Sequence, residues 1–174
     1  MHPRLSELLT YVGRETSALR EVYESVPPDD RNVRPDPTRW SPAEIVHHLA
    51  IVDQRIVQLL GRLIEQARAL PPETETAPLL PSPVVSRVLD RSRRFRTSQA
   101  SEPLQTDRER VWDELLATRR ALADVVATGD GLALGSVSAP HPALGTFNGY
   151  DWITFVGAHA ARHADQILEM RRAH

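Results

Sequence analysis

The sequence predicts an all-α fold, a four-helix bundle in one domain over residues 1–174, and three observations support it. Four long stretches place apolar residues three or four positions apart, which is the period of an amphipathic helix. Three of these stretches begin at capping residues, and three are followed by proline or glycine. No stretch shows the alternation of apolar and polar residues that is typical of a β-strand. Proline and glycine between the helices indicate long, irregular connections.

The first predicted helix covers residues 5–26, and Pro27 and Pro28 end it because proline cannot continue a helix. Its apolar positions are Leu5, Leu8, Leu9, Val12, Leu19, Val22 and Val26. The link over residues 29–40 contains two further prolines. We expect this link to be an ordered turn region and not a flexible tether.

The second predicted helix has the clearest start signal in the sequence. Ser41 and Glu44 form a capping box, with Pro42 at the first helical position. The apolar stripe that follows consists of Ile45, Leu49, Val52, Ile56, Leu59, Leu63 and Leu70. Pro71 and Pro72 are therefore predicted to end this helix.

The middle of the chain contains a connection, a short helix and a third long helix. Residues 73–83 are acidic and rich in proline, and they are predicted to form an exposed connection. Residues 84–95 are predicted to form a short basic helix. The third long helix opens at a second capping box over residues 106–109 and ends at Gly129. Its apolar positions include Val111, Leu115, Leu122 and Val126.

The last predicted helix, residues 151–170, carries the residues on which the functional interpretation depends. Asn148 is its expected N-cap, and residues 132–147 before it are predicted to be a loop. His159 and His163 lie four residues apart, so the helical period stacks both rings on one face. The same face carries Trp152, Phe155, Val156, Ile167 and Met170. Both imidazoles are therefore predicted to point into an apolar interior.

The composition excludes several classes of protein. With a net charge of -2 and a pI near 6.4, the chain has no basic footprint for nucleic acid. It contains no cysteine, which excludes disulfides, a thiolate nucleophile and cysteine-ligated metal sites. The N-terminus lacks the apolar run of a signal peptide, and no stretch has the length of a membrane span. A cytoplasmic location without membrane attachment is expected.

Helical phase separates the two adjacent histidines of the second helix. At roughly 100° per residue, His48 falls about 60° from the centre of the apolar stripe, and His47 falls about 160° from it. His48 is therefore predicted to face the interior, and His47 is predicted to face solvent. A candidate metal site follows, made of His48 together with His159 and His163 of the last helix.

The chemistry of these three histidines favours a metal site. Three neutral imidazoles suit a divalent transition metal and leave coordination positions open for water or substrate. The alternative is that each histidine is a hydrogen-bonded core residue, since histidine pairs four residues apart also arise by chance. Three inward-facing rings favour the metal, because polar rings are costly to bury without a partner. A zinc-protease motif is excluded, because Ala160 stands where that motif requires glutamate.

Two separated segments carry a family resemblance. The first is the run Trp40–Ala50, and the second is the run His141–Gly145 followed by Trp152, Phe155, His159, Arg162, His163 and Gln166. In order and spacing they resemble the DinB-like superfamily, which contains the YfiT-type metal proteins and the bacillithiol- and mycothiol-dependent transferases. The resemblance covers most of the chain, from Leu5 to Met170.

The resemblance implies a four-helix bundle of the DinB/YfiT type, often a homodimer, with a three-histidine site for a divalent metal. The motif positions of the ligands fall on His48, His159 and His163, in agreement with the phase argument. The metal could be zinc, nickel, iron or manganese, because histidine ligands suit several of these ions.

Three further residues are candidates for supporting the ligands or contacting a substrate. Gln166 lies one turn beyond His163, where it could orient a ligand or a metal-bound water, or make a hydrogen bond at the edge of the core. Arg162 is a candidate for binding an anionic substrate group, with a surface ion pair as the alternative. His141 lies in the loop expected near the open face of the metal, and it is not predicted to be a ligand.

The predicted function is a metal-dependent transferase of a low-molecular-weight thiol, which attacks an electrophilic small-molecule substrate. This prediction rests on analogy with relatives that share the site. One alternative is a metal-dependent hydrolase that uses the same three histidines, although no general base is evident in the sequence. The other is a non-enzymatic metal-binding or stress-response bundle. Against it, structural zinc sites usually have four protein ligands, and only three are identified.

Overall fold

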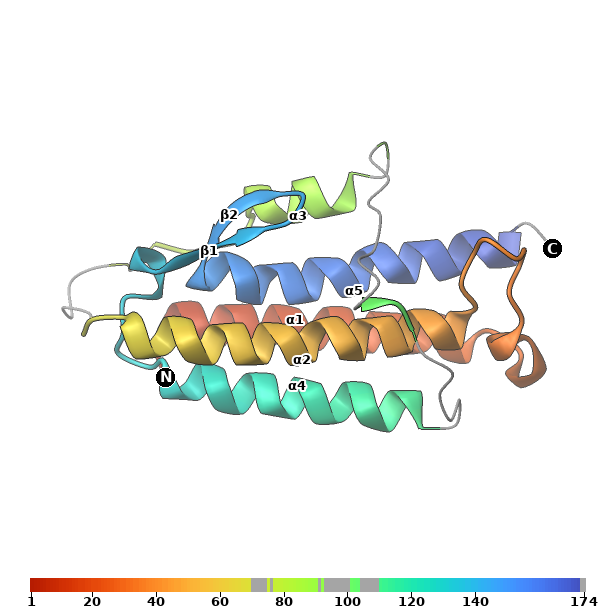
Figure 1. Ribbon diagram of the computed structural model, residues 1–174, viewed down its shortest axis with the longest axis horizontal. Coiled ribbons are helices and arrows are strands. Elements are labelled where there is room, and N and C mark those ends of the chain that lie inside the picture. Colours follow the sequence, from red (N-terminus) through yellow and green to blue (C-terminus); the bar gives the residue numbers. More distant parts are fainter. Residues whose placement is uncertain (70–74, 76, 91, 93–100, 104–109, 173–174) are drawn as a thin grey trace.

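The computed structural model describes residues 1–69, 75, 77–90, 92, 101–103 and 110–172, and this part of the chain is mostly helical, as predicted. Four long helices lie side by side along the molecule (Figure 1): α1 (Pro3–Glu24), α2 (Pro42–Gln66), α4 (Val111–Thr128) and α5 (Gly149–Arg172). Helices α1 and α5 run in one direction, and α2 and α4 run in the other (Figure 1). In the described part of the chain, no helix combines the length and the apolar character that crossing a membrane requires.

The long helices pack in two pairs that share a core. Helix α1 packs along α5 and α2 packs along α4, while α2 also contacts α5. The fully buried side chains of this core include Leu8, Leu49, Leu60, Leu115, Leu122 and Ile153. Because α2 touches both α4 and α5, two of its faces are covered. This arrangement decides the surroundings of its two histidines.

Both helices that carry the candidate ligands begin at reciprocal caps. At α2, Ser41 Oγ accepts a hydrogen bond from the Glu44 amide at 3.2 Å, and the Glu44 carboxylate accepts one from the Ser41 amide at 2.8 Å. At α5, Asn148 Oδ1 accepts from the Asp151 amide at 2.9 Å, and Asp151 Oδ2 accepts from the Asn148 amide at 3.1 Å. The predicted capping box and the predicted N-cap Asn148 are both confirmed. These caps fix the residue at which each helix begins and so the direction of its side chains.

The end of α2 differs from the prediction. The helix ends at Gln66 and does not reach the predicted position near Leu70. The chain becomes extended directly after the helix, and the Arg68 carbonyl accepts a hydrogen bond from the Ala133 amide at 2.9 Å. Pairing with the segment after α4 therefore replaces the last predicted helical turn. Periodicity along one helix cannot reveal such a pairing.

The connections between the long helices contain further structure. A short 3-10 helix, η1 (Pro28–Asn32), forms part of the link predicted to be an ordered turn region. The predicted basic helix over residues 84–95 is observed as the shorter α3 (Pro83–Leu89), and residues 91 and 93–95 lie outside the described residues. The predicted capping box over residues 106–109 also lies outside them.

The predicted loop over residues 132–147 contains a β-hairpin, so the expectation of no strands was wrong at this place. Strands β1 (Ser138–His141) and β2 (Gly145–Asn148) pair in antiparallel register. Each strand has only four residues, which is too short for an alternating pattern to be recognised. Gly145 adopts a φ of 90°, a conformation that glycine reaches at little cost. The hairpin and α3 lie beside α5, on its side away from α4 in the view of Figure 1.

Helices α2 and α4 share a buried ion pair. Arg119 Nη2 lies 3.1 Å from Asp53 Oδ2, and the two side chains are 8% and 0% exposed. Burial raises the pKa of Asp53 to about 6, and the charge of Arg119 opposes this rise. The same burial lowers the pKa of Arg119, with Asp53 opposing the change. In both residues the loss of hydration outweighs the attraction between the charges.

Gly157 allows α1 and α5 to approach closely. A β-carbon at this position would lie 2.5 Å from Cε1 of Tyr11, a residue only 5% exposed. We expect Gly157→Ala to lower the free energy of unfolding by about 1–3 kcal/mol, because the ring or the helices must move. Urea unfolding measures this loss. In a Tyr11→Leu background the loss should shrink, and an equal loss in both backgrounds would place the strain elsewhere.

Candidate metal centre

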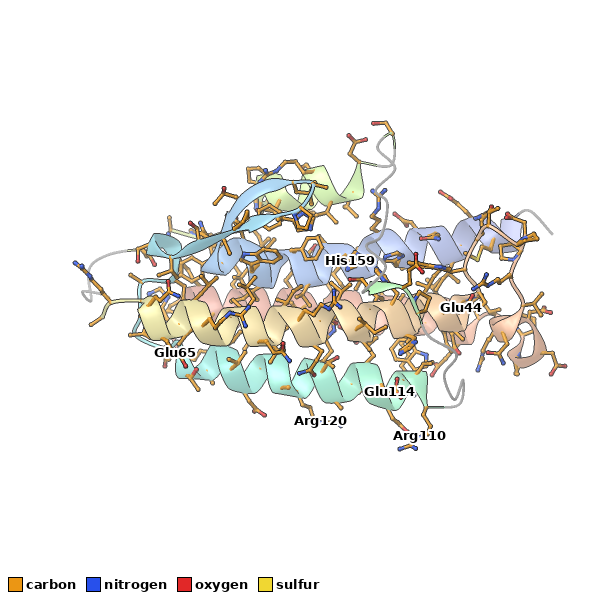
Figure 2. The ribbon with its side chains drawn as sticks, in the orientation of Figure 1. Glu44, Glu65, Arg110, Glu114, Arg120 and His159 are labelled. Carbon is orange, nitrogen blue, oxygen red and sulfur yellow. The ribbon has the colours of Figure 1, made fainter. Side chains whose placement is uncertain are left out.

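Three histidines from two helices lie together in the structure. His48 comes from the N-terminal half of α2, and His159 and His163 come from α5, where His159 lies near the middle of the helix (Figure 2). One ring nitrogen from each histidine lies within 4.8 Å of the corresponding atoms of the other two. The Nε2 atoms of His159 and His163 are 3.0 Å apart. These are the three residues that helical phase selected.

The positions on the two helices explain why the rings meet. The four-residue spacing on α5 stacks the rings of His159 and His163 with their centroids 4.6 Å apart. The ring of His48 reaches them from α2, at centroid distances of 5.3 Å and 5.2 Å. The ring of Trp40, at the entry to α2, lies 4.8 Å from that of His48. His48 and His163 are only 5% and 8% exposed, so these two rings are largely shielded from water.

Hydrogen bonds to Nδ1 set the protonation of two of the rings. His48 Nδ1 lies 2.7 Å from the Ser101 carbonyl oxygen, which can only accept, so the ring proton is on Nδ1. His163 Nδ1 likewise donates to Gln166 Oε1 at 2.9 Å. In a neutral ring the other nitrogen, Nε2, is then an unprotonated lone pair. Both rings are therefore held in the form that binds a metal through Nε2.

Burial favours the neutral form of His48 and His159. It lowers the pKa of His48, with a smaller opposing effect from the hydrogen bond to Ser101. It lowers the pKa of His159 well below the usual range, and the neighbouring His163, His48 and Arg119 lower it further. Neutral imidazoles keep their lone pairs available near pH 7. The Nε2 lone pair of His163 faces His159 Nε2, so it is satisfied either by a proton on His159 or by a cation.

The three histidines form part of the wall of a cavity of about 710 Å³. Its apolar lining includes Val52, Ile56, Leu59, Val88, Trp152 and Phe155. Its cationic side chains are Arg55 and Arg162, and the described lining residues include no aspartate or glutamate. The cavity is large enough for a small organic molecule beside the histidines. Away from the histidines, its lining suits an apolar or anionic organic molecule better than an organic cation.

The structure places the three further candidates at this cavity with different contacts. Gln166 Oε1 accepts a hydrogen bond from His163 Nδ1 at 2.9 Å, a contact that fits both predicted alternatives. Arg162 donates from Nη1 to the backbone carbonyls of Val88 and Asp90, at 2.7 Å and 2.8 Å, and thereby ties the end of α3 to α5. His141 lines the cavity from β1.

His47 does not face solvent, and this prediction was wrong. The residue is only 7% exposed, and its Nε2 lies 3.9 Å from the Glu114 carboxylate. Phase placed His47 correctly on the face opposite His48, but α4 covers that face of α2. Phase gives a direction on one helix and does not reveal which neighbour occupies that direction.

Sequence reasoning missed two residues that shape the site. Ser101 supplies a backbone carbonyl to His48 across 53 positions of sequence. Arg55 lines the cavity one turn before Leu59, and its Nη1 donates to Ser101 Oγ at 2.9 Å. A backbone acceptor in a connection leaves no signal in residue type. The position of Arg55 beside the apolar stripe of α2 is a signal that could have been used.

One comparison with known proteins identifies a family. The model of the DinB superfamily matches residues 12–167, which is most of the chain. No curated protein and no solved structure matches the chain.

Proposed function

The chain belongs to the DinB superfamily, and on that premise we propose that it binds a divalent transition metal through His48, His159 and His163. The observation that carries the proposal is the convergence of three ring nitrogens within 4.8 Å of one another. Two of the rings have their Nδ1 protons engaged by oxygen acceptors. The candidate metals are zinc, nickel, iron and manganese, since histidine nitrogen donors suit several of these ions.

We further propose that the protein is a transferase of a low-molecular-weight thiol. A bound metal would supply a Lewis acid that keeps an external thiol deprotonated near neutral pH. The chain contains no cysteine, so the sulfur nucleophile must come from outside. The residues around the site hold the three imidazoles in place, exclude water with aromatic and aliphatic walls, and offer room for an electrophilic substrate.

The same resemblance supports finer proposals about the architecture. The four long helices correspond to a bundle of the DinB/YfiT type in a single domain, with the hairpin and α3 as additions beside α5. A homodimer and a cytoplasmic location remain predictions.

The alternative functions differ in how the residues at the cavity support them. A hydrolase needs a general base to activate water, and no aspartate or glutamate is present among the described lining residues. A purely structural zinc site normally has four protein ligands, while the cluster found in the described residues contains three. The first observation favours the transferase over the hydrolase, and the second favours an enzyme over a structural site.

Purified protein loaded with zinc or nickel tests the transferase directly. We expect it to accelerate the loss of thiol by at least roughly tenfold, equivalent to about 1.4 kcal/mol in the barrier, when 1-chloro-2,4-dinitrobenzene is the electrophile. Bacillithiol, mycothiol and glutathione are compared as nucleophiles. In each reaction the sulfur bonds to the ring carbon and chloride leaves. A chelator should remove the acceleration, and added metal should restore it.

The control for this assay is the same mixture without thiol. Consumption of the electrophile by the metal-loaded protein in the absence of thiol, with release of the phenol, favours the hydrolase. Metal binding without either reaction favours the non-enzymatic alternative.

A further inference from the structure

His141 packs against an aromatic cluster at the wall of the cavity. It is the last residue of β1, and its ring centroid lies 5.2 Å from that of Phe147, 5.6 Å from Trp152 and 4.9 Å from Phe155. Phe155 also stacks against His159, with centroids 4.9 Å apart. Phe155 therefore links the ring of His141 to the histidine cluster.

Two backbone amides fix which nitrogen of His141 carries the proton. The amides of Ala143 and Leu144, in the turn of the hairpin, point at His141 Nδ1 at 3.1 Å and 3.2 Å. A backbone N–H can only donate, so Nδ1 accepts both bonds and carries no proton. Burial lowers the pKa of His141, which favours the neutral ring. The proton of that neutral ring is then on Nε2.

The Nε2 atom of His141 carries a proton, whereas the Nε2 atoms of His48 and His163 do not. His48 and His163 donate from Nδ1 to oxygen acceptors, so their Nε2 atoms are lone pairs. His141 accepts at Nδ1, so its Nε2 is a donor. Among the described residues, none accepts a hydrogen bond from this group. The cavity that His141 lines thus brings together lone pairs that suit a cation and a ring whose donor, Nε2–H, suits an oxygen.

A role for His141 as a fourth metal ligand conflicts with this arrangement. Coordination through Nε2 requires the proton to move to Nδ1, and that nitrogen would then face two N–H donors. The change would cost both hydrogen bonds of the turn. The ring is therefore set up to donate.

We propose that His141 Nε2–H is a substrate-binding group that donates a hydrogen bond to a carbonyl or carboxylate oxygen. The substrate class is an electrophile with such an oxygen next to an apolar body, because Trp152, Phe155 and Leu59 line the same space. A neutral imidazole held in one tautomer polarises a carbonyl without giving up its proton. The inference rests on the proposed function in one respect, since it takes this cavity to be the substrate site.

Two variants separate the roles of the two ring nitrogens. In His141→Asn the side-chain oxygen replaces Nδ1 and keeps the turn, but no donor extends into the cavity. In His141→Gln the longer amide places an N–H near the position of Nε2. The probes are acetophenone, which carries a carbonyl, and ethylbenzene, which has the same size and no acceptor. Binding of both to the full-length protein is measured by NMR titration.

We expect wild-type protein to bind acetophenone more tightly than ethylbenzene. His141→Asn should weaken acetophenone binding roughly fivefold, the usual contribution of one hydrogen bond, and should leave ethylbenzene within about twofold. His141→Gln should restore the preference for acetophenone. Nitrogen-15 spectra of the His141 ring should show protonated Nε2 at neutral pH.

Three results would overturn the inference. They are equal affinity of the wild type for the two probes, equal weakening of both probes by His141→Asn, and a ring protonated at Nδ1. Metal content of the variants is measured in parallel. If the wild-type protein binds no metal but still prefers acetophenone to ethylbenzene, the metal site is refuted. The hydrogen-bond donor at His141 Nε2 is then still supported. Loss of metal from His141→Asn would indicate that His141 is a ligand, and it would overturn the inference as well.

Discussion

His48→Ala is expected to reduce bound divalent metal from about one ion per chain to nearly none at micromolar free metal. The substitution removes one of three nitrogen donors and leaves the pair on α5 without its partner from α2. Loss of a residue that merely orients a ligand weakens metal binding by roughly 10–100-fold, so loss of a ligand should exceed roughly 100-fold. Elemental analysis after gel filtration and calorimetric titration with zinc or nickel measure the effect.

The adjacent residue provides the matched control. His47→Ala removes an imidazole of the same size from the same turn of α2, but on the face that α4 covers. This variant is expected to keep its metal. Circular dichroism checks that both variants fold. Equal metal content in the two variants, whether high or low, would contradict the assignment of His48 as a ligand.

Thermal unfolding gives a second measure of the same site. A metal that binds only the folded chain stabilises it by about 2.7 kcal/mol when its free concentration is 100 times the dissociation constant. Wild type and His47→Ala should gain this stability on adding metal, and His48→Ala should not.

The histidine cluster was predictable because its signals are local to two helices. The capping box at Ser41 fixes the start of α2, and Asn148 fixes the start of α5. Once each start is known, the helical period decides which side chains share a face. The inward direction of His48 and the stacking of the pair on α5 both follow from that period.

Features that depend on partners distant in sequence were not predictable in the same way. The surroundings of His47 depend on α4, and the tautomer of His48 depends on a carbonyl 53 residues away. The hairpin was missed because four residues per strand show no recognisable period, although its turn fixes the tautomer of His141. Packing between elements, and not local propensity, decides these features.

The buried ion pair combines one residue with a local sequence signal and one that depends on a distant partner. Asp53 is four residues beyond Leu49 on the apolar stripe of α2, which is a local signal of an unusual core residue. Its partner Arg119 follows only from the packing of α2 against α4. Neither oxygen of Asp53 makes a hydrogen bond in the described structure, so Arg119 supplies its compensating charge.

Arg119→Met is therefore expected to cost about 3–5 kcal/mol of stability at pH 8, because it leaves an uncompensated carboxylate in the core. The cost should be smaller at pH 5. Without the cation, the pKa of Asp53 rises further above its wild-type value of about 6, so at pH 5 the carboxyl is neutral. Urea unfolding at the two pH values measures the difference.

The sign of the pH dependence follows from the direction of the pKa shift. The folded pKa of Asp53, about 6, lies above its usual value of 3.8, so folding favours the protonated form. The stability that this residue contributes is complete below about pH 4, and it is lost as pH rises through 6. In Arg119→Met the loss continues to higher pH, since the folded pKa is higher still. Equal destabilisation at pH 5 and pH 8 would contradict this account.

A double variant separates the cost of an unpaired charge from the cost of lost packing. Adding Asp53→Leu to Arg119→Met removes both charges and fills the site with apolar side chains. Most of the stability lost at pH 8 should return, because replacing a buried ion pair by apolar residues is often neutral or stabilising. The additional pH dependence of Arg119→Met should disappear with the carboxyl. If the double variant is no more stable than Arg119→Met at pH 8, the guanidinium stabilises the core by packing and not by charge.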